Sequence, residues 1–206
     1  MKQRPGPFTV LAAIVGFVLA SAGMHQLLQW WHREPAVPTN LAQRAWVETP
    51  LATVVFDTPW ALHADKLDLP AEIKDLVKSS AYIANEVDGL TIGAMEFSFA
   101  QDIDVPSRLD GAADGALANL RTPPGTLSVD PHKSDTTVLG NRAIELDARI
   151  RRDGGEPLRA HGVVLSDNNS LFILIAVARA DQAGADTAWN RILKSIRARS
   201  PAASPR

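Results

Sequence analysis

Histidine is the side chain in this sequence that most readily supplies acid–base or metal chemistry near neutral pH. The 206-residue chain has five histidines, and none is expected to share a face with a second metal ligand two to four residues away. His161 falls in the middle of a predicted strand, where a hydrogen-bonded structural role is favoured over metal binding. The five are His25, His32, His63, His132 and His161.

Other combinations that could do chemistry are incomplete. Asp102 and Asp104 could hold Ca²⁺ in a predicted loop, but the loop lacks the glycine and the later glutamate of a calcium site, so we interpret both as helix-capping residues. There is no Gly-x-Ser-x-Gly sequence, and the pair Gly154 and Gly155 lacks a phosphate-loop lysine, which is typical of a turn. Because cysteine is absent, disulfides, thiolate metal sites and thiol catalysis are excluded. The sequence predicts no catalytic residue, no metal site and no cofactor.

A row of alternating charges lies on one face of a predicted strand. Such a row is ordinarily solvated or paired across strands, but it could also line a groove in a layered fold. Three tryptophans are interpreted as core or edge anchors rather than as a ligand box. The charged residues are Glu145, Asp147, Arg149 and Arg151, and the tryptophans are Trp46, Trp60 and Trp189.

Composition limits the classes of partner. With 46% hydrophobic and 21% charged residues, the chain can form one domain with an appendage. Twenty-one basic against twenty-three acidic residues give a net charge of −2, so no basic field favours nucleic acid.

The N-terminal segment predicts export or anchoring. Lys2 and Arg4 precede an uncharged stretch, residues 5–24, in the order that a signal sequence requires. As a signal peptide it would be cleaved near Ala22, after a small-x-small motif. As a retained anchor, residues 8–31 would reach about 36 Å, enough to cross a hydrocarbon core of about 30 Å, with Trp30 and Trp31 at the interface. The spanning length and the tryptophan pair favour the anchor, and both alternatives put the following domain outside the cytoplasm.

The rest of the chain divides by composition. Residues 32–45 contain prolines and scattered polar residues, which predict a linker between the N-terminal segment, residues 1–31, and the domain. Residues 46–199 carry periodic apolar patterns, and residues 200–206 are expected to be a disordered tail.

Alternating patterns and turn signals predict the elements of the domain. Strands are expected at 51–56 and 60–63 as an opening hairpin, at 81–86 and 90–99 around Asp88 and Gly89, and at 143–152, 158–165 and 170–178 as a meander. Apolar residues at helical spacing predict helices at 69–78, at 107–121 with Ser107 as the N-cap, and at 185–199.

Residues 170–178 decide the predicted architecture. The segment carries no charge, so both of its faces must be covered, and the helices at 107–121 and 185–199 are the expected covers. Short loops require a mostly antiparallel sheet. The sequence therefore predicts an α+β fold, an α/β/α sandwich preceded by a transmembrane or signal helix.

Several motifs in the second half resemble the PsbP-like family, which includes Mog-type and DcrB-like proteins. They are the turn at 138–143, the hairpin at 153–155, the apolar strand at 171–177 and the closing helix at 189–196. The resemblance implies an α/β/α sandwich whose members mostly bind or stabilise other proteins, and it transfers no functional residue.

Together these observations predict a non-catalytic periplasmic accessory protein, tethered to the inner membrane through the lipid bilayer, that assists an envelope protein partner. The alternative is a small-molecule-binding or hydrolytic domain that uses His161 or the loop of Asp102 and Asp104.

Overall fold

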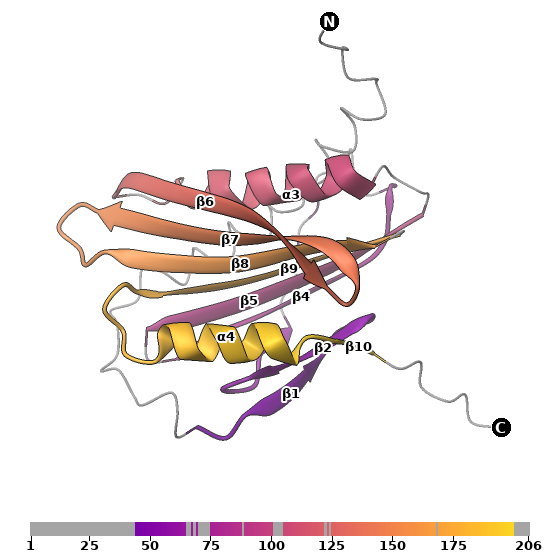
Figure 1. Cartoon of the computed structure of the whole chain (residues 1–206), viewed down its shortest axis with the longest axis horizontal. Helices are drawn as coiled ribbons and strands as arrows, with labels where there is room; N and C mark the ends of the chain where they lie inside the picture. The colour runs from indigo at the N-terminus through magenta and orange to yellow at the C-terminus, as the bar shows by residue number, and fades with distance from the viewer. Residues whose placement is uncertain are drawn as a thin grey trace, which may run out of the picture.

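The computed structural model describes residues 44–64, 67, 69, 75–87, 89–100, 105–121, 123, 125–167 and 169–199. Over these residues the chain forms two antiparallel sheets and two helices (Figure 1). The bounds are β1 (Val47–Pro50), β2 (Val54–Thr58), β3 (His63–Ala64), β4 (Val77–Val87), β5 (Leu90–Phe99), α3 (Val105–Asn119), β6 (Thr126–Val138), β7 (Asn141–Arg152), β8 (Leu158–Asp167), β9 (Ser170–Arg179), α4 (Ala185–Ser195) and β10 (Arg197–Ala198).

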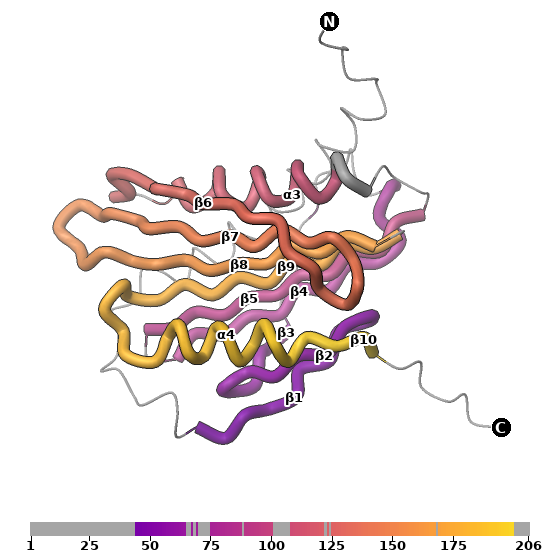
Figure 2. The backbone as a smooth tube through the Cα atoms, viewed as in Figure 1, coloured from indigo at the N-terminus to yellow at the C-terminus, as the bar shows by residue number. Residues whose placement is uncertain are grey.

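The main sheet has the order β3-β4-β5-β9-β8-β7-β6. The predicted meander is confirmed, since β7, β8 and β9 pair with one another in sequence. The predicted hairpin of β4 and β5 is also confirmed, and Gly89 has the positive φ of 77° that its turn requires. The backbone trace in Figure 2 shows β6 to β9 running side by side along the length of the sheet.

Strand β9 contributes to two separate cores because its side chains alternate between the faces of the sheet. Leu171, Ile173 and Ile175 belong to the core beneath α3. Their neighbours Phe172 and Leu174 belong to the core beneath α4. The absence of charge in this segment therefore reflects burial on both faces.

Helix α3 approaches the sheet closely through small residues. Ala112, Ala113 and Ala116 are buried against β7 and β8. On β8 the facing position is Gly162, where an added Cβ would lie 3.3 Å from Leu146. The predicted helix at 107–121 is confirmed as an element, but it begins at Val105, so Ser107 lies inside the helix and is not its N-cap.

The opposite face of the sheet is covered by α4 together with a small sheet of order β1-β2-β10, and Figure 1 shows that sheet lying next to α4. Phe56 of β2 packs on Phe172 of β9 with ring centroids 5.8 Å apart. The buried carboxylate of Glu96 on β5 fixes the turn between β1 and β2 by accepting the backbone N–H groups of Ala52 and Thr53 at 2.7 and 2.9 Å.

The predicted α/β/α sandwich is wrong, because the described fold is dominated by antiparallel sheet and has only two short helices. The sandwich prediction assumed that helices alone cover the two faces, whereas a second sheet shares one face with α4. Helix α4 ends at Ser195, and the residues predicted to continue it to 199 turn into β10, which pairs with β2.

Two other element predictions fail. Residues 51–56 do not pair with 60–63, because β2 pairs with β1 and β10 while β3 joins β4. The described end of the predicted helix at 69–78 is a turn followed by the first two residues of β4; residues 70–74 lie outside the described residues.

The N-terminal segment 1–31, most of the linker 32–45 and the tail 200–206 also lie outside the described residues. Within the described part of the chain, neither helix is both long and apolar enough to cross a membrane.

Candidate functional site

The polar face of the main sheet meets the start of α4 at His161. On β8, Arg159 and His161 are two residues apart and therefore project from the same face, towards α4. On β7, Asp147 is the direct cross-strand neighbour of His161. Asp186, in the first turn of α4, completes the group. We call Asp147, Arg159, His161 and Asp186 the His161 cluster.

Each member of the His161 cluster is bonded to another member. Arg159 donates two hydrogen bonds to Asp147, Nη2 to Oδ2 at 2.7 Å and Nε to Oδ1 at 3.3 Å. Its remaining nitrogen, Nη1, donates to Asp186 Oδ2 at 2.7 Å. His161 Nε2 lies 3.1 Å from Asp186 Oδ1, and Nδ1 lies 3.9 Å from Asp147 Oδ2. The cluster thus ties β7 and β8 to the first turn of α4.

Asp147 is held in its ionised form. The hydrogen bonds from Arg159 lower the pKa of Asp147 below its ordinary value, and the charges of His161 and Arg159 act in the same direction, while partial burial opposes them. The same contact raises the pKa of Arg159. At neutral pH Asp147 is therefore an acceptor and not a proton donor.

Trp189 forms a wall beside the cluster. Its indole stacks on the imidazole of His161, with ring centroids 5.6 Å apart and planes at 11°. The indole N–H donates to Glu145 Oε1 at 3.4 Å, so Glu145 of the predicted charged row helps to hold the Trp189 ring in place. Trp189 is buried in the core beneath α4, as its interpretation as an anchor predicted.

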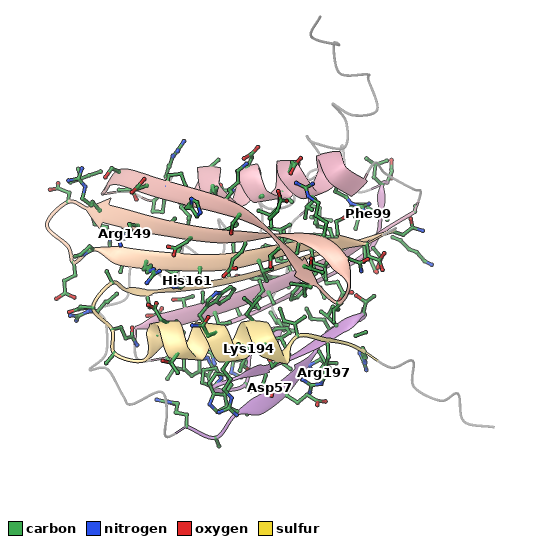
Figure 3. The ribbon with its side chains drawn as sticks, viewed as in Figure 1. Asp57, Phe99, Arg149, His161, Lys194 and Arg197 are labelled. Atoms are coloured by element: carbon green, nitrogen blue, oxygen red, sulfur yellow. The ribbon has the colours of Figure 1, made fainter. Side chains whose placement is uncertain are left out.

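A cleft of about 110 Å³ opens next to this wall. It lies between the first turn of α4 and strands β5, β8 and β9. Its apolar lining comes from Leu90, Ala176, Ala178, Trp189 and Ile192, and its polar lining includes Arg159, His161, Arg179, Asp186 and Thr187. Figure 3 shows His161 beside α4, with Arg149 on the neighbouring strand.

The two ring nitrogens of His161 both face carboxylates. A histidine that serves as a general base needs a ring nitrogen within reach of a hydroxyl or thiol nucleophile. Here Nε2 of His161 lies against Asp186 and Nδ1 faces Asp147. Over the part of the chain that the structure describes, no three histidine, aspartate or glutamate side chains are grouped to hold a metal ion.

The other candidates from the sequence occupy scattered positions. His132, opposite Asp147 on β6, is exposed, and so is His63 on β3. Arg151 donates to Ser128 Oγ at 2.9 Å, which fits the paired-row interpretation. Gly154 has a φ of 62° in the β7–β8 turn.

Two of the predicted tryptophan anchors contact arginines. The guanidinium of Arg191 lies 4.0 Å from the ring centroid of Trp46, and that of Arg44 lies 5.5 Å from the ring centroid of Trp60. Four candidates lie outside the described residues, namely His25, His32, Asp102 and Asp104.

Sequence reasoning missed Arg159, Arg179 and Asp186. Arg159 could have been found, because it precedes His161 by two residues in a predicted strand and so shares its face. Asp186 is 25 residues from His161 and is brought to it only by the packing of α4.

Comparisons with known proteins find solved structures whose backbones are similar to that of this chain. No family model matches the chain, and no curated protein matches it. LpqN of Mycobacterium tuberculosis, described as involved in cell envelope biogenesis, is 21% identical with a TM-score of 0.46, over 78% of this chain and 95% of LpqN. PA94 of Pseudomonas aeruginosa, of unknown function, is 16% identical with a TM-score of 0.39, over 68% of this chain and 99% of PA94.

A Bacteroides thetaiotaomicron protein is 10% identical with a TM-score of 0.44, over 78% of this chain and 50% of that one. TM-scores below 0.5 and low identity do not assign the chain to a family. The resemblance to the PsbP-like family therefore stays a prediction.

Proposed function

We propose that this chain is a non-catalytic accessory protein that binds a protein partner at the outer face of a bacterial-type inner membrane, where its N-terminal segment anchors it. The observation that carries the proposal is the internal pairing of the His161 cluster, because its one arginine bonds both aspartates and its histidine lies against one of them. A site built this way holds α4 to the sheet and presents a shaped surface, rather than a free nucleophile or base.

The size of the cleft supports binding of a small protruding group. Pockets for drug-sized ligands usually measure about 300–1,000 Å³. A cleft of about 110 Å³ is smaller than the cavity of about 150 Å³ that accommodates benzene in an engineered protein. It is suited to one side chain of a partner, the way that interface hot spots are filled.

Cross-linking in intact envelopes tests the protein-binding function. The full chain, carrying an affinity tag after residue 206, is cross-linked in cells, solubilised and purified, and its partners are identified by mass spectrometry. The control is residues 1–45 fused to an unrelated folded domain, which shares the predicted anchor and linker but lacks the sheet. We expect at least one protein to be recovered reproducibly with the full chain and not with the control. Equal recovery with both chains, or no reproducible protein, contradicts the proposal.

The second candidate is a small-molecule-binding or hydrolytic domain, favoured only by the position of His161 at the wall of the cleft. It predicts that the full chain hydrolyses short acyl esters and that His161→Gln abolishes the activity. An activity that the substitution leaves unchanged, or no activity in the wild-type chain, removes this candidate.

A further inference from the structure

The mouth of the cleft is acidic because of how its ion pairs are oriented. At one rim, the Asp186 side chain is 60% exposed while that of its partner Arg159 is 31% exposed. Arg179, which also lines the cleft, is paired with Asp181 and Glu156, two carboxylates just outside the lining. Their side chains are 70% and 55% exposed, while that of Arg179 is 24% exposed. Solvent therefore meets carboxylates first, and the guanidinium groups lie against the protein.

The charges around the cleft leave a surplus of carboxylates. Its two arginines are bonded to four aspartates and glutamates, and Arg179 lowers the pKa of Asp181, which keeps that carboxylate ionised. The N-terminus of α4 has a partial positive charge, but Asp186 in its first turn offsets it. An anion would have to displace one of these carboxylates from its arginine, whereas a cation can approach their exposed oxygens directly.

The interior of the cleft is apolar. Leu90, Ala176, Ala178 and Ile192 line it, and the Trp189 ring forms one wall. All five of these side chains are buried, so the cleft offers hydrocarbon and an aromatic ring beneath its acidic mouth. The matching ligand has a flexible alkyl stem and a compact positive head, which is the chemistry of a lysine side chain.

We propose that the cleft binds a lysine side chain of the protein partner, with the stem against Ile192 and Trp189 and the ammonium group at Asp181 and Asp186. This inference rests on the proposed protein-binding function. A protein segment is a better occupant than a free amine, because the polar strand face beside the cleft gives the residues flanking the lysine a surface to cover. That face carries exposed Asp130 and His132 on β6 and exposed Arg149 on β7. Arg149 is labelled in Figure 3.

The chemistry can be tested with a defined probe. The full chain in zwitterionic detergent micelles is titrated with N-acetyl-lysine methylamide, and the Trp189 indole N–H resonance is followed by NMR. N-acetyl-norleucine methylamide, which has the same stem without the charge, is the matched probe. We expect the lysine probe to shift the resonance saturably and the norleucine probe to bind several-fold more weakly.

Charge-neutralising variants then locate the contact. Asp181→Asn and Asp186→Asn are each expected to weaken binding of the lysine probe by about two- to fivefold, the range for an exposed ion pair. Asp135→Asn is the matched control, because Asp135 is an exposed carboxylate paired with Arg142 at the far end of β6. Equal affinity for the two probes, or equal weakening by the control, overturns the proposal. Asp181 accepts hydrogen bonds from Arg179 at the end of β9, so its variant tests the mouth even where Asp186→Asn loosens α4.

A photo-cross-linker links the cleft to the partner. Thr187 is an exposed residue of the lining, and a photoreactive amino acid at this position is expected to capture the partner found in envelopes. Asp181→Asn combined with Asp186→Asn should reduce that capture. Undiminished capture contradicts lysine binding by the cleft but is compatible with the protein-binding function. A saturable shift of the Trp189 resonance by the lysine probe, with no partner recovered from envelopes, contradicts the protein-binding function instead.

Discussion

Asp147 is the residue whose ionisation contributes most clearly to folding at the site. Its pKa is lowered in the folded state, so the unfolded chain binds a proton more readily than the native chain does. The resulting stabilisation is fully present above the ordinary aspartate pKa of about 3.9 and is lost as the pH falls through the lower folded value.

The first prediction concerns the pH dependence of stability. Asp147→Asn removes the ionised acceptor of two hydrogen bonds from Arg159, so the free energy of unfolding should fall by about 1 kcal/mol at pH 7, after allowing for partial exposure. The difference from wild type should shrink between about pH 5 and pH 2, because wild type loses this contribution there. Urea unfolding of the full chain in micelles at pH 7, 5 and 3 measures it.

Asp114→Asn is the control for this prediction, since Asp114 is an exposed aspartate with one ion pair, to Lys133. It should change stability by less than about 0.5 kcal/mol at each pH. An Asp147→Asn variant whose stability differs from wild type by the same amount at pH 7 and pH 3 would contradict the assignment.

At the scale of single residues, the sequence predicts faces but not partners. Alternation in β7 correctly puts Glu145, Asp147 and Arg149 on one face. The structure adds that His161 of β8 lies directly opposite Asp147, on the same face of the sheet. What could not be predicted is that α4 would place Asp186 and Trp189 against them. That contact depends on how the helix packs across the sheet, and no local pattern encodes it.

At the scale of elements, the sequence predicts strands that have at least one buried apolar face, and it misses strands whose side chains are mostly exposed. β7 and β9 have regular or continuous apolar patterns and are found. β6 has 13 residues, most of them exposed, so it shows no alternation that could identify it. Its turn to β7 does carry a signal, with positive φ at Leu139 and Gly140, but a turn alone does not define the strand that precedes it.

The small sheet was missed for a different reason. β10 pairs with β2 across about 140 residues, and Arg197 of β10 bonds Asp57 and Glu48. Pairing over such a separation is determined by tertiary structure, because local propensity favours continuing α4 through these residues. The α/β/α prediction is wrong for the same reason. Without the pairing of β10 with β2, the prediction contained no second sheet that could cover the main sheet beside α4.

The second prediction concerns the outer edge of β6. Among the described strands, β6 is last in the main sheet and pairs only with β7. Pro131 lacks an N–H group and Lys133 is charged, and both are features that prevent edge strands from pairing with other chains. Pro131→Thr combined with Lys133→Val should therefore produce concentration-dependent self-association, measured by analytical ultracentrifugation in micelles.

Pro131→Thr combined with Lys133→Arg is the matched control, because it restores the same N–H group but keeps the charge and the possible contact with Asp114. It should associate markedly less than the valine variant. If both variants sediment as wild type does over the whole concentration series, the edge is protected by something other than these two residues.

At the scale of the whole molecule, one sheet serves two cores and the polar surface lies at one of its ends. Alternate side chains of β9 enter both cores, so each core depends on the same strand. The His161 cluster and the cleft lie where β7, β8 and β9 meet the first turn of α4. A partner bound there would contact strands that both cores hold in place. The site is therefore formed by the packed sheet itself.

The last prediction concerns how the whole chain is attached to the membrane. The predicted anchor, residues 8–31, spans about 36 Å as a helix against a hydrocarbon core of about 30 Å, and Trp30 and Trp31 lie at its distal end. We therefore expect the mature chain from envelopes to retain Met1, with or without its formyl group, and to resist extraction by high salt or carbonate. Intact-mass spectrometry distinguishes this from cleavage after Ala22, which gives a chain beginning at Gly23. Externally added protease should degrade the domain in spheroplasts but not in intact cells. A chain that starts at Gly23 and is released with the periplasmic fraction would contradict the anchor and indicate a free periplasmic protein.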